Sequence, residues 1–181
     1  MKRSIIKLIT GCFLIAAIIS CNQGPSLQSY IVDNQEANNF TTIDLPTSVV
    51  SFDESKLNED QMQAYNSVKR LNFLGYRLKE GNEAEYKAEL EKVNAILKNK
   101  KYKELMRMGN NEKGKVLIKY LGTETKIEEL IVFGNMNDQG FGILRVLGKN
   151  MKPDNMVKLV DAMQNADIDE DQLKGITDFF K

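Results

Sequence analysis

The chain has 181 residues with 25 basic side chains, 25 acidic side chains and no histidine, so its formal net charge at pH 7 is zero. Without histidine, neither a Ser-His-Asp triad nor a Cys-His nucleophile can be assembled, and zinc sites with histidine ligands are excluded. The absence of a basic excess also argues against a nucleic-acid partner, because neutralisation of phosphates drives that kind of binding.

The first twenty residues resemble a secretory signal peptide. Three basic side chains occupy the first seven positions, and an apolar run follows from Leu8 to Ile19. That run is too short for a membrane-spanning helix, which needs about 20 residues, so the weaker alternatives are an uncleaved signal anchor and an ordinary signal peptide with an incidental cysteine. The run ends in Ile18-Ile19-Ser20-Cys21, which resembles a lipobox with Ile in place of the usual Leu. We expect cleavage of residues 1–20 and attachment of lipid to Cys21.

Lipidation of Cys21 has consequences for the rest of the chain. Cys12 leaves with the signal peptide and Cys21 carries the lipid, so no thiol remains for a disulfide or for redox chemistry. The three basic residues of the signal are lost as well, which leaves a net charge of −3. We interpret residues 21–28 as a flexible tether and residues 29–181 as one domain. Because no acidic residue precedes Asp33 in the tether, we expect the periplasmic face of the outer membrane.

The first part of this domain predicts short strands and one helix. Residues 30–32 and 47–52 are β-prone, and the polar segment 34–42 between them is typical of turns. Asn58 and Gln61 have the spacing of a capping box, which predicts a helix over about 59–66. The aromatic-rich segment 71–78 is then expected to form a strand.

A longer helix is expected over about residues 83–99. Asn82 and Glu85 repeat the capping-box spacing, and apolar residues follow at helical intervals. Residues 102–108 then predict a strand, so that the two strands and the helix would form a parallel β-α-β unit.

The remainder of the chain predicts a meander of three strands and two helices. The strands are expected at 115–121, 127–133 and 141–147, followed by a helix from Pro153 and a last helix at 169–180. The predicted fold class is therefore α+β: one mixed, mostly antiparallel sheet with helices packed on one face. The expected core includes Phe73, Leu90, Val93, Leu97, Ile131, Phe133, Ile143, Val146 and Val160.

One group of acidic residues has the spacing of a calcium loop. Asp167, Asp169 and Asp171 match its first three ligand positions, but Gln172 stands where the loop needs glycine and Lys174 stands where it needs an apolar residue. We therefore interpret these acids as the start of the last helix, and we expect no metal and no cofactor.

Four other groups of residues are explained better by structure than by chemistry. They are the Gly/Asn-rich stretch 135–142, the basic run Lys98, Lys100, Lys101 and Lys103, the acids Glu124, Glu128 and Glu129, and the pair Met106 and Met108. We interpret them, in that order, as a hairpin turn, a solvated helix end, solvated strand-end side chains and fillers of gaps in the core. No catalytic residue is proposed.

Four blocks of the sequence are similar to one known family. They are SYIVDNQE at Ser29 to Glu36, YKELMRMG at Tyr102 to Gly109, IEELIVFG at Ile127 to Gly134 and GFGILRVLGKNM at Gly140 to Met151. Together they resemble the domain of unknown function 4252 family of small Gram-negative lipoproteins, over about residues 28–166. The family has no assigned activity, so the resemblance implies no functional residue. Members are often encoded near extracytoplasmic sigma-factor genes, which implies an association with envelope signalling.

These observations lead to three hypotheses about function. The first is a non-enzymatic envelope module that binds a protein partner or supports the envelope stress response. The second is a small-molecule-binding domain with an apolar pocket lined by Met and aromatic side chains. The third is a hydrolase that uses carboxylates, which would need two acids converging in a cleft.

Overall fold

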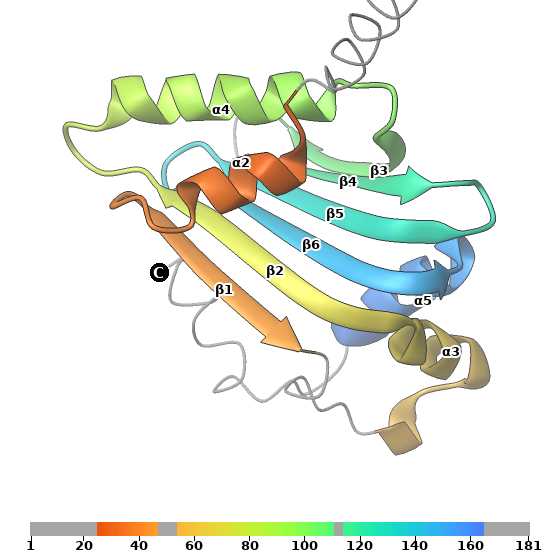
Figure 1. Cartoon of the computed structure of the whole chain (residues 1–181). Helices are drawn as coiled ribbons and strands as arrows, with labels where there is room; N and C mark the ends of the chain where they lie inside the picture. Colours follow the sequence, from red (N-terminus) through yellow and green to blue (C-terminus); the bar gives the residue numbers. More distant parts are fainter. Residues whose placement is uncertain (1–24, 47–53, 111–113, 165–181) are drawn as a thin grey trace, which may run out of the picture.

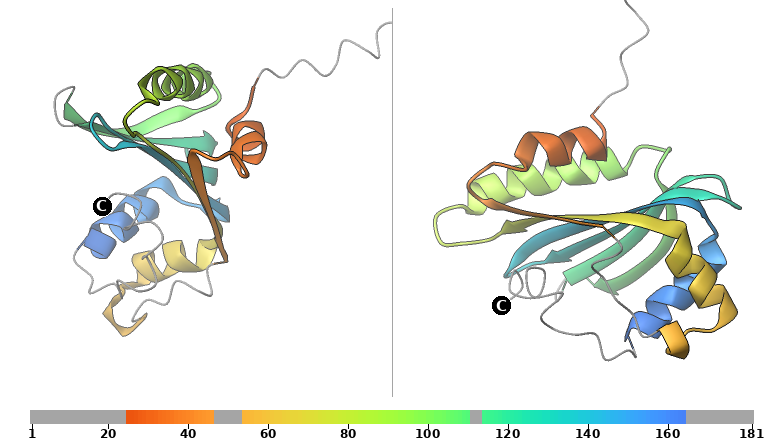
Figure 2. Two further views of the ribbon diagram at one scale, coloured as in Figure 1. Left: turned by 90° about the vertical axis from the view of Figure 1, so that its left-hand side faces the viewer. Right: turned by 60° about the horizontal axis from the view of Figure 1, so that its bottom comes forward.

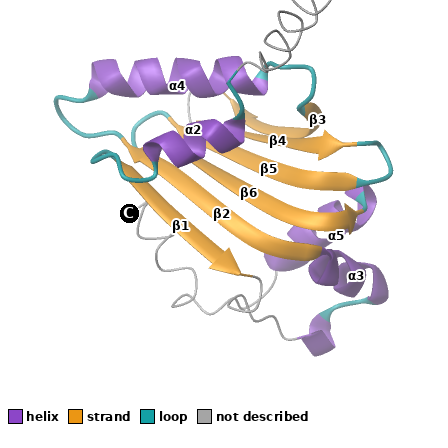
Figure 3. Cartoon of the chain, viewed as in Figure 1, coloured by secondary structure: helices purple, strands orange, loops and turns teal. Residues whose placement is uncertain are grey.

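The computed structural model describes residues 25–46, 54–110 and 114–164, which form a six-stranded antiparallel sheet in the order β1-β2-β6-β5-β4-β3 (Figure 1). The strands are β1 (Phe40–Pro46), β2 (Val68–Arg77), β3 (Lys103–Asn110), β4 (Gly114–Gly122), β5 (Ile127–Met136) and β6 (Gly140–Met151). The helices are α2 (Leu27–Asn34), α3 (Glu59–Ser67), α4 (Glu83–Leu97) and α5 (Pro153–Gln164), with a 3-10 turn at Glu54–Lys56 (Figure 3). The predicted α+β class with one sheet is confirmed.

Two details of the predicted architecture need correction. The sheet is not mixed, because every pair of neighbouring strands is antiparallel. Strands β2 and β3 do run in the same direction, as expected of strands joined through a helix, but three strands separate them. The reason is that the chain returns from β3 through successive hairpins, and its last strand β6 takes the place beside β2.

The helices also cover both faces of the sheet rather than one (Figure 2). Helices α2 and α4 lie side by side on one face, where they enclose a core rich in aromatic residues. Helices α3 and α5 pack together on the opposite face over a second, mainly aliphatic core. A sheet with apolar side chains on both faces must be covered on both sides, and the alternating pattern of the strands supplies two such faces.

The segment predicted as a first strand, residues 30–32, belongs instead to helix α2. Its N-cap is Ser26, whose side chain accepts a hydrogen bond from the Ser29 amide while Ser29 binds back to the Ser26 amide. Leu27, Tyr30 and Ile31 then fall on one side of the helix and are buried, whereas Val32 stays exposed. Helical spacing of apolar residues has overridden the β propensity of Tyr30 to Val32. Helix α2 thus includes residues 27 and 28 of the expected tether.

Strand β1 lies earlier than the sequence suggests. The expected strand at 47–52 falls outside the described residues, and the polar segment before it contains the actual strand start at Phe40. The Phe40 ring packs edge-on against Tyr76, with 5.0 Å between ring centroids, and also contacts Phe141. This aromatic contact anchors the start of a strand that contains Thr41, Thr42 and Asp44.

Nearly all of the other helices and strands begin and end within three residues of the predicted positions. The capping box of α3 forms between Asn58 and Gln61. In α4 the Asn82 side chain makes no cap, because it is used in the preceding turn, where it accepts from the Lys79 amide and donates to the Arg77 carbonyl oxygen. The Gly/Asn-rich stretch is a hairpin turn between β5 and β6, as predicted.

The expected core is largely confirmed. Phe73, Val93, Leu97, Ile131, Phe133, Ile143 and Val146 are buried. Leu90 is only partly buried against the aromatic core, and the side chain of Val160 and the expected helix 169–180 lie outside the described residues. Within the described part of the chain, no helix is long and apolar enough to cross a membrane.

Candidate functional site

The face of the sheet under α2 and α4 changes character along the strands. One row of residues that pair across neighbouring strands on this face consists of Thr42, Leu74, Ile143, Phe133 and Leu117, and its last four members pack into the aromatic core. The next row, two residues further along each strand, is Asp44, Asn72, Arg145, Ile131 and Lys119. Polar side chains therefore begin at this second row of the sheet.

A groove with a volume of about 510 Å³ lies over this polar region, between α2 and the sheet. Its helical wall is formed by Gln28, Ile31, Val32 and Gln35. Strands β1, β2, β4, β5 and β6 supply its floor and opposite rim, with Arg145 among the floor residues. We call this feature the Arg145 groove. It combines an exposed apolar side chain, Val32, with charged groups of both signs.

Arg145 and Glu129 form a buried, bidentate ion pair in the groove. The Arg145 Nε donates to Glu129 Oε1 at 2.6 Å and Nη2 donates to Oε2 at 2.8 Å. The two side chains are 6% and 12% exposed. The pair is a cross-strand diagonal, since Arg145 stands opposite Ile131 and Glu129 stands opposite Leu147. The third guanidinium nitrogen, Nη1, has no hydrogen bond to any residue that the structure describes, so Arg145 retains a donor.

This ion pair is costly to bury. Removing two charges from water carries a desolvation penalty that their attraction often only balances, and well-packed apolar residues can stabilise a fold equally well. Apolar side chains already flank the pair, including Ile131 and Leu147. The fold therefore has no evident need of charge at this point.

A second ion pair occupies the rim of the groove. Arg70 Nε lies 3.3 Å from Asp44 Oδ1, which also accepts a 2.7 Å hydrogen bond from the Asn72 side chain. The Arg70 side chain is 59% exposed and the Asp44 side chain is 50% exposed, and exposed ion pairs contribute little stability. Their side chains are therefore free to exchange partners at low cost.

Another polar cluster lies deeper, between α2 and α4. The Tyr30 hydroxyl donates to Glu89 Oε2 at 2.8 Å, and Lys92 Nζ donates to Glu89 Oε1 at 2.6 Å. Burial, and then the bond to Glu89, raises the pKa of Tyr30 above the usual value of tyrosine. Tyr30 and Glu89 are both buried and neither lines the groove. The arrangement ties the first helix to α4 and is structural.

The residues singled out from the sequence differ in burial and in their contacts. Glu129 is not solvated as expected, because it is paired with Arg145; Glu128 is exposed at the edge of the groove. Met108 is 39% exposed on strand β3 and does not fill the core. Asp167, Asp169, Asp171 and the lipidation candidate Cys21 lie outside the described residues. Among the residues that are described, no cluster of three or more His, Cys, Asp or Glu side chains could hold a metal ion.

Arg145 was not identified from the sequence, although the sequence contains a signal for it. It is the single charged residue in the apolar run from Phe141 to Leu147. Its partner could not be found in this way, because the pairing depends on the register of β5 against β6.

The family model described as Domain of unknown function (DUF4252) matches residues 30–159. The chain belongs to the DUF4252 family. The match spans all six strands and includes both Arg145 and Glu129. Comparisons with curated proteins and with solved structures gave no match. Because the DUF4252 description carries no activity, function must be argued from the Arg145 groove itself.

Proposed function

We propose that this DUF4252 protein is a lipid-anchored, non-enzymatic module of the bacterial cell envelope that binds a polar segment of a protein partner in the Arg145 groove. The anchor is lipid on Cys21, and the proposed location is the periplasmic face of the outer membrane. The signal peptide and the lipobox-like residues before Cys21 support the anchor. The groove supports the binding role.

The observation that carries the binding role is the Arg145–Glu129 pair. A buried charge pair is weak evidence of stabilisation, and here it lies in the floor of an open groove. Arg145 Nη1, which has no partner among the described residues, and the exposed Arg70 can both donate to acceptors on a ligand. Val32, which is 54% exposed on the opposite wall, offers an apolar contact beside them.

The two alternative functions fit the groove less well. A small apolar ligand needs a pocket with mainly apolar walls, whereas five charged side chains line this groove: Asp44, Arg70, Glu128, Glu129 and Arg145. A carboxylate hydrolase needs two acids free to act on one bond, but Glu129 is bound to Arg145 and Asp44 is bound to Asn72. A peptide, with its many hydrogen-bonding groups, suits a lining of this kind.

Site-specific photo-crosslinking in cells tests the binding role. A photo-reactive amino acid placed at Val32 should give one dominant adduct with an envelope protein, because this side chain is exposed at the groove wall. The matched control is Met108, which is also an exposed apolar residue but is not part of the groove. Equal adduct patterns from the two positions would contradict binding in the groove.

Lipid labelling tests the anchor separately. Incorporation of radiolabelled palmitate should be lost in Cys21→Ser, because lipidation uses the sulfur of this residue, and an uncleaved precursor should accumulate. Cys12→Ser is the control and should label normally, since Cys12 lies within the signal peptide. Unchanged labelling of Cys21→Ser would rule out the proposed anchor.

A further inference from the structure

The place where the chain enters the folded domain is fixed by one hydrogen bond. The Leu27 amide donates to the Tyr102 hydroxyl at 2.9 Å, and both residues are buried. The start of α2 therefore lies against the turn that joins α4 to β3, as Figure 1 also shows. The chain between Cys21 and Leu27 can span at most about 20 Å. A lipid on Cys21 would hold this end of the domain close to the membrane.

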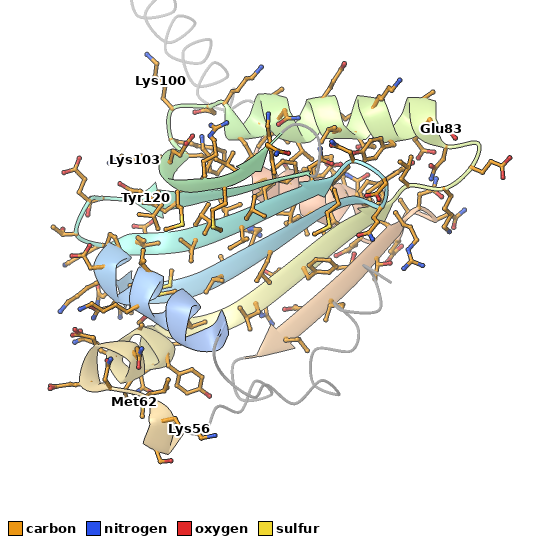
Figure 4. All side chains as sticks on the ribbon, turned by 180° about the vertical axis from the view of Figure 1, so that it is seen from behind. Lys56, Met62, Glu83, Lys100, Lys103 and Tyr120 are labelled. Atoms are coloured by element: carbon orange, nitrogen blue, oxygen red, sulfur yellow. The ribbon has the colours of Figure 1, made fainter. Side chains whose placement is uncertain are left out.

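This same turn carries a cluster of lysines, which we call the lysine patch: Lys98, Lys100, Lys101 and Lys103. Lys98, Lys100 and Lys103 are exposed and Lys101 is partly exposed. Two of the lysines lie over aromatic rings, Lys101 over Tyr102 at 5.1 Å and Lys103 over Tyr120 at 5.8 Å. Figure 4 places Lys100 and Lys103 at the end of the molecule opposite Glu83, where α4 begins.

The segments that form the patch and the chain entry contain no acidic side chain of their own. Residues 92–103 contain no acidic side chain, and neither do residues 22–32 of the entering chain. The next acid in the sequence, Glu104, is already paired with Arg107 at 2.7 Å. Helix α4 ends at Leu97, and the effect of a helix dipole falls off within the last turn, so the dipole of α4 does not explain all four lysines. Their position beside the chain entry does offer an explanation.

We infer that the lysine patch docks on anionic phospholipid headgroups of the membrane that holds the lipid, and so orients the Arg145 groove relative to that membrane. This inference rests on the proposed lipid anchor. A basic group near an anionic leaflet strengthens binding by about fivefold for each lysine, within a Debye length of about 8 Å. The short tether allows the patch to come within this range of the headgroups.

Lysine footprinting of the lipidated full chain tests the inference. The protein is reconstituted into vesicles of phosphatidylcholine alone or of phosphatidylcholine and phosphatidylglycerol in equal parts, and lysine acetylation is then followed by mass spectrometry. The patch lysines should be modified several-fold more slowly in the anionic vesicles, and high salt should remove the difference. The internal controls are Lys79 and Lys87, which lie towards the other end of α4 and should react equally in both vesicles.

The outcomes separate this inference from the proposed anchor. Loss of the chain from both kinds of vesicle on washing would overturn the anchor, and the docking with it. Retention with equal acetylation of the patch in both vesicles would overturn the docking alone, and so would protection that does not depend on lipid charge. As a matched pair of variants, Lys98→Glu with Lys100→Glu should abolish the protection of Lys101 and Lys103. Lys79→Glu with Lys87→Glu should preserve it, and the opposite result would also contradict the inference.

Discussion

Arg145 occupies a position in the middle of β6 where the neighbouring side chains on both faces are mostly apolar. Its charge is tolerated because Glu129 reaches it diagonally from β5 and accepts two hydrogen bonds. The two residues form a unit, since neither could be buried alone without a large desolvation cost. Substitution of one residue and substitution of both should therefore have opposite consequences.

Arg145→Met should lower the free energy of unfolding by about 3–5 kcal/mol, because it leaves the Glu129 carboxylate buried without its partner. The double substitution Glu129→Leu with Arg145→Met should be close to neutral or stabilising, because it replaces both charges with apolar groups of similar size. Urea unfolding of the three proteins measures these differences. A double variant less stable than Arg145→Met would show that the pair is a structural necessity.

The buried Tyr30 hydroxyl should make the stability of the fold depend on pH in the alkaline range. Its pKa is raised in the folded protein, so the unfolded chain releases the tyrosine proton first, from about pH 10 upward. The stability associated with this proton is complete below pH 10 and is lost as the pH rises further, by about 1.4 kcal/mol at pH 11. Tyr30→Phe should remove this contribution. The variant should still lose stability above pH 10, because burial also raises the pKa of Tyr76 and of Tyr86. Its decline in stability should be shallower than that of the wild type. Identical slopes for wild type and variant above pH 10 would contradict the assignment.

At the scale of elements, the sequence was most informative where spacing and capping agreed. The apolar stripe of α4 and the capping box of α3 located both helices correctly, and the glycine-containing turns separated the later strands. Helix α2 was missed because Tyr30, Ile31 and Val32 all favour strands, whereas the preceding Leu27 and the Ser26 cap decide the outcome. Strand β1 was missed because it is held by its pairing with β2 and by the packing of Phe40. Both contacts join residues far apart in the sequence, so local composition does not reveal them.

The buried side of α4 can be tested with two substitutions. Leu97 is buried against the aromatic core, so Leu97→Ala should lower the free energy of unfolding by about 2–5 kcal/mol. Glu91 is exposed on the same helix, and Glu91→Ala should change it by no more than about 0.5 kcal/mol. Thermal or urea unfolding distinguishes the two, and similar stabilities would mean that the helix face has been assigned incorrectly.

At the scale of the whole molecule, the fold class followed from the sequence but the arrangement of its layers did not. The order of the strands depends on which strand β6 pairs with, and a helix on either face of the sheet satisfies the same amphipathic pattern. The groove was equally inaccessible to sequence analysis, because Asp44, Arg70, Glu129 and Arg145 come from four different strands. The lysine patch was visible in the sequence as a basic run, but the Leu27–Tyr102 hydrogen bond is needed to place it beside the chain entry.

Binding of a protein partner in the Arg145 groove can be tested by crosslinking from Val32 in the Glu129→Leu, Arg145→Met background. The double variant should remain folded, with a melting temperature at or above that of the wild type, because the apolar pair replaces the ion pair without leaving a charge unpaired. The dominant adduct formed from Val32 in the wild type should nevertheless disappear. An adduct of unchanged identity and yield in the folded double variant would contradict the claim.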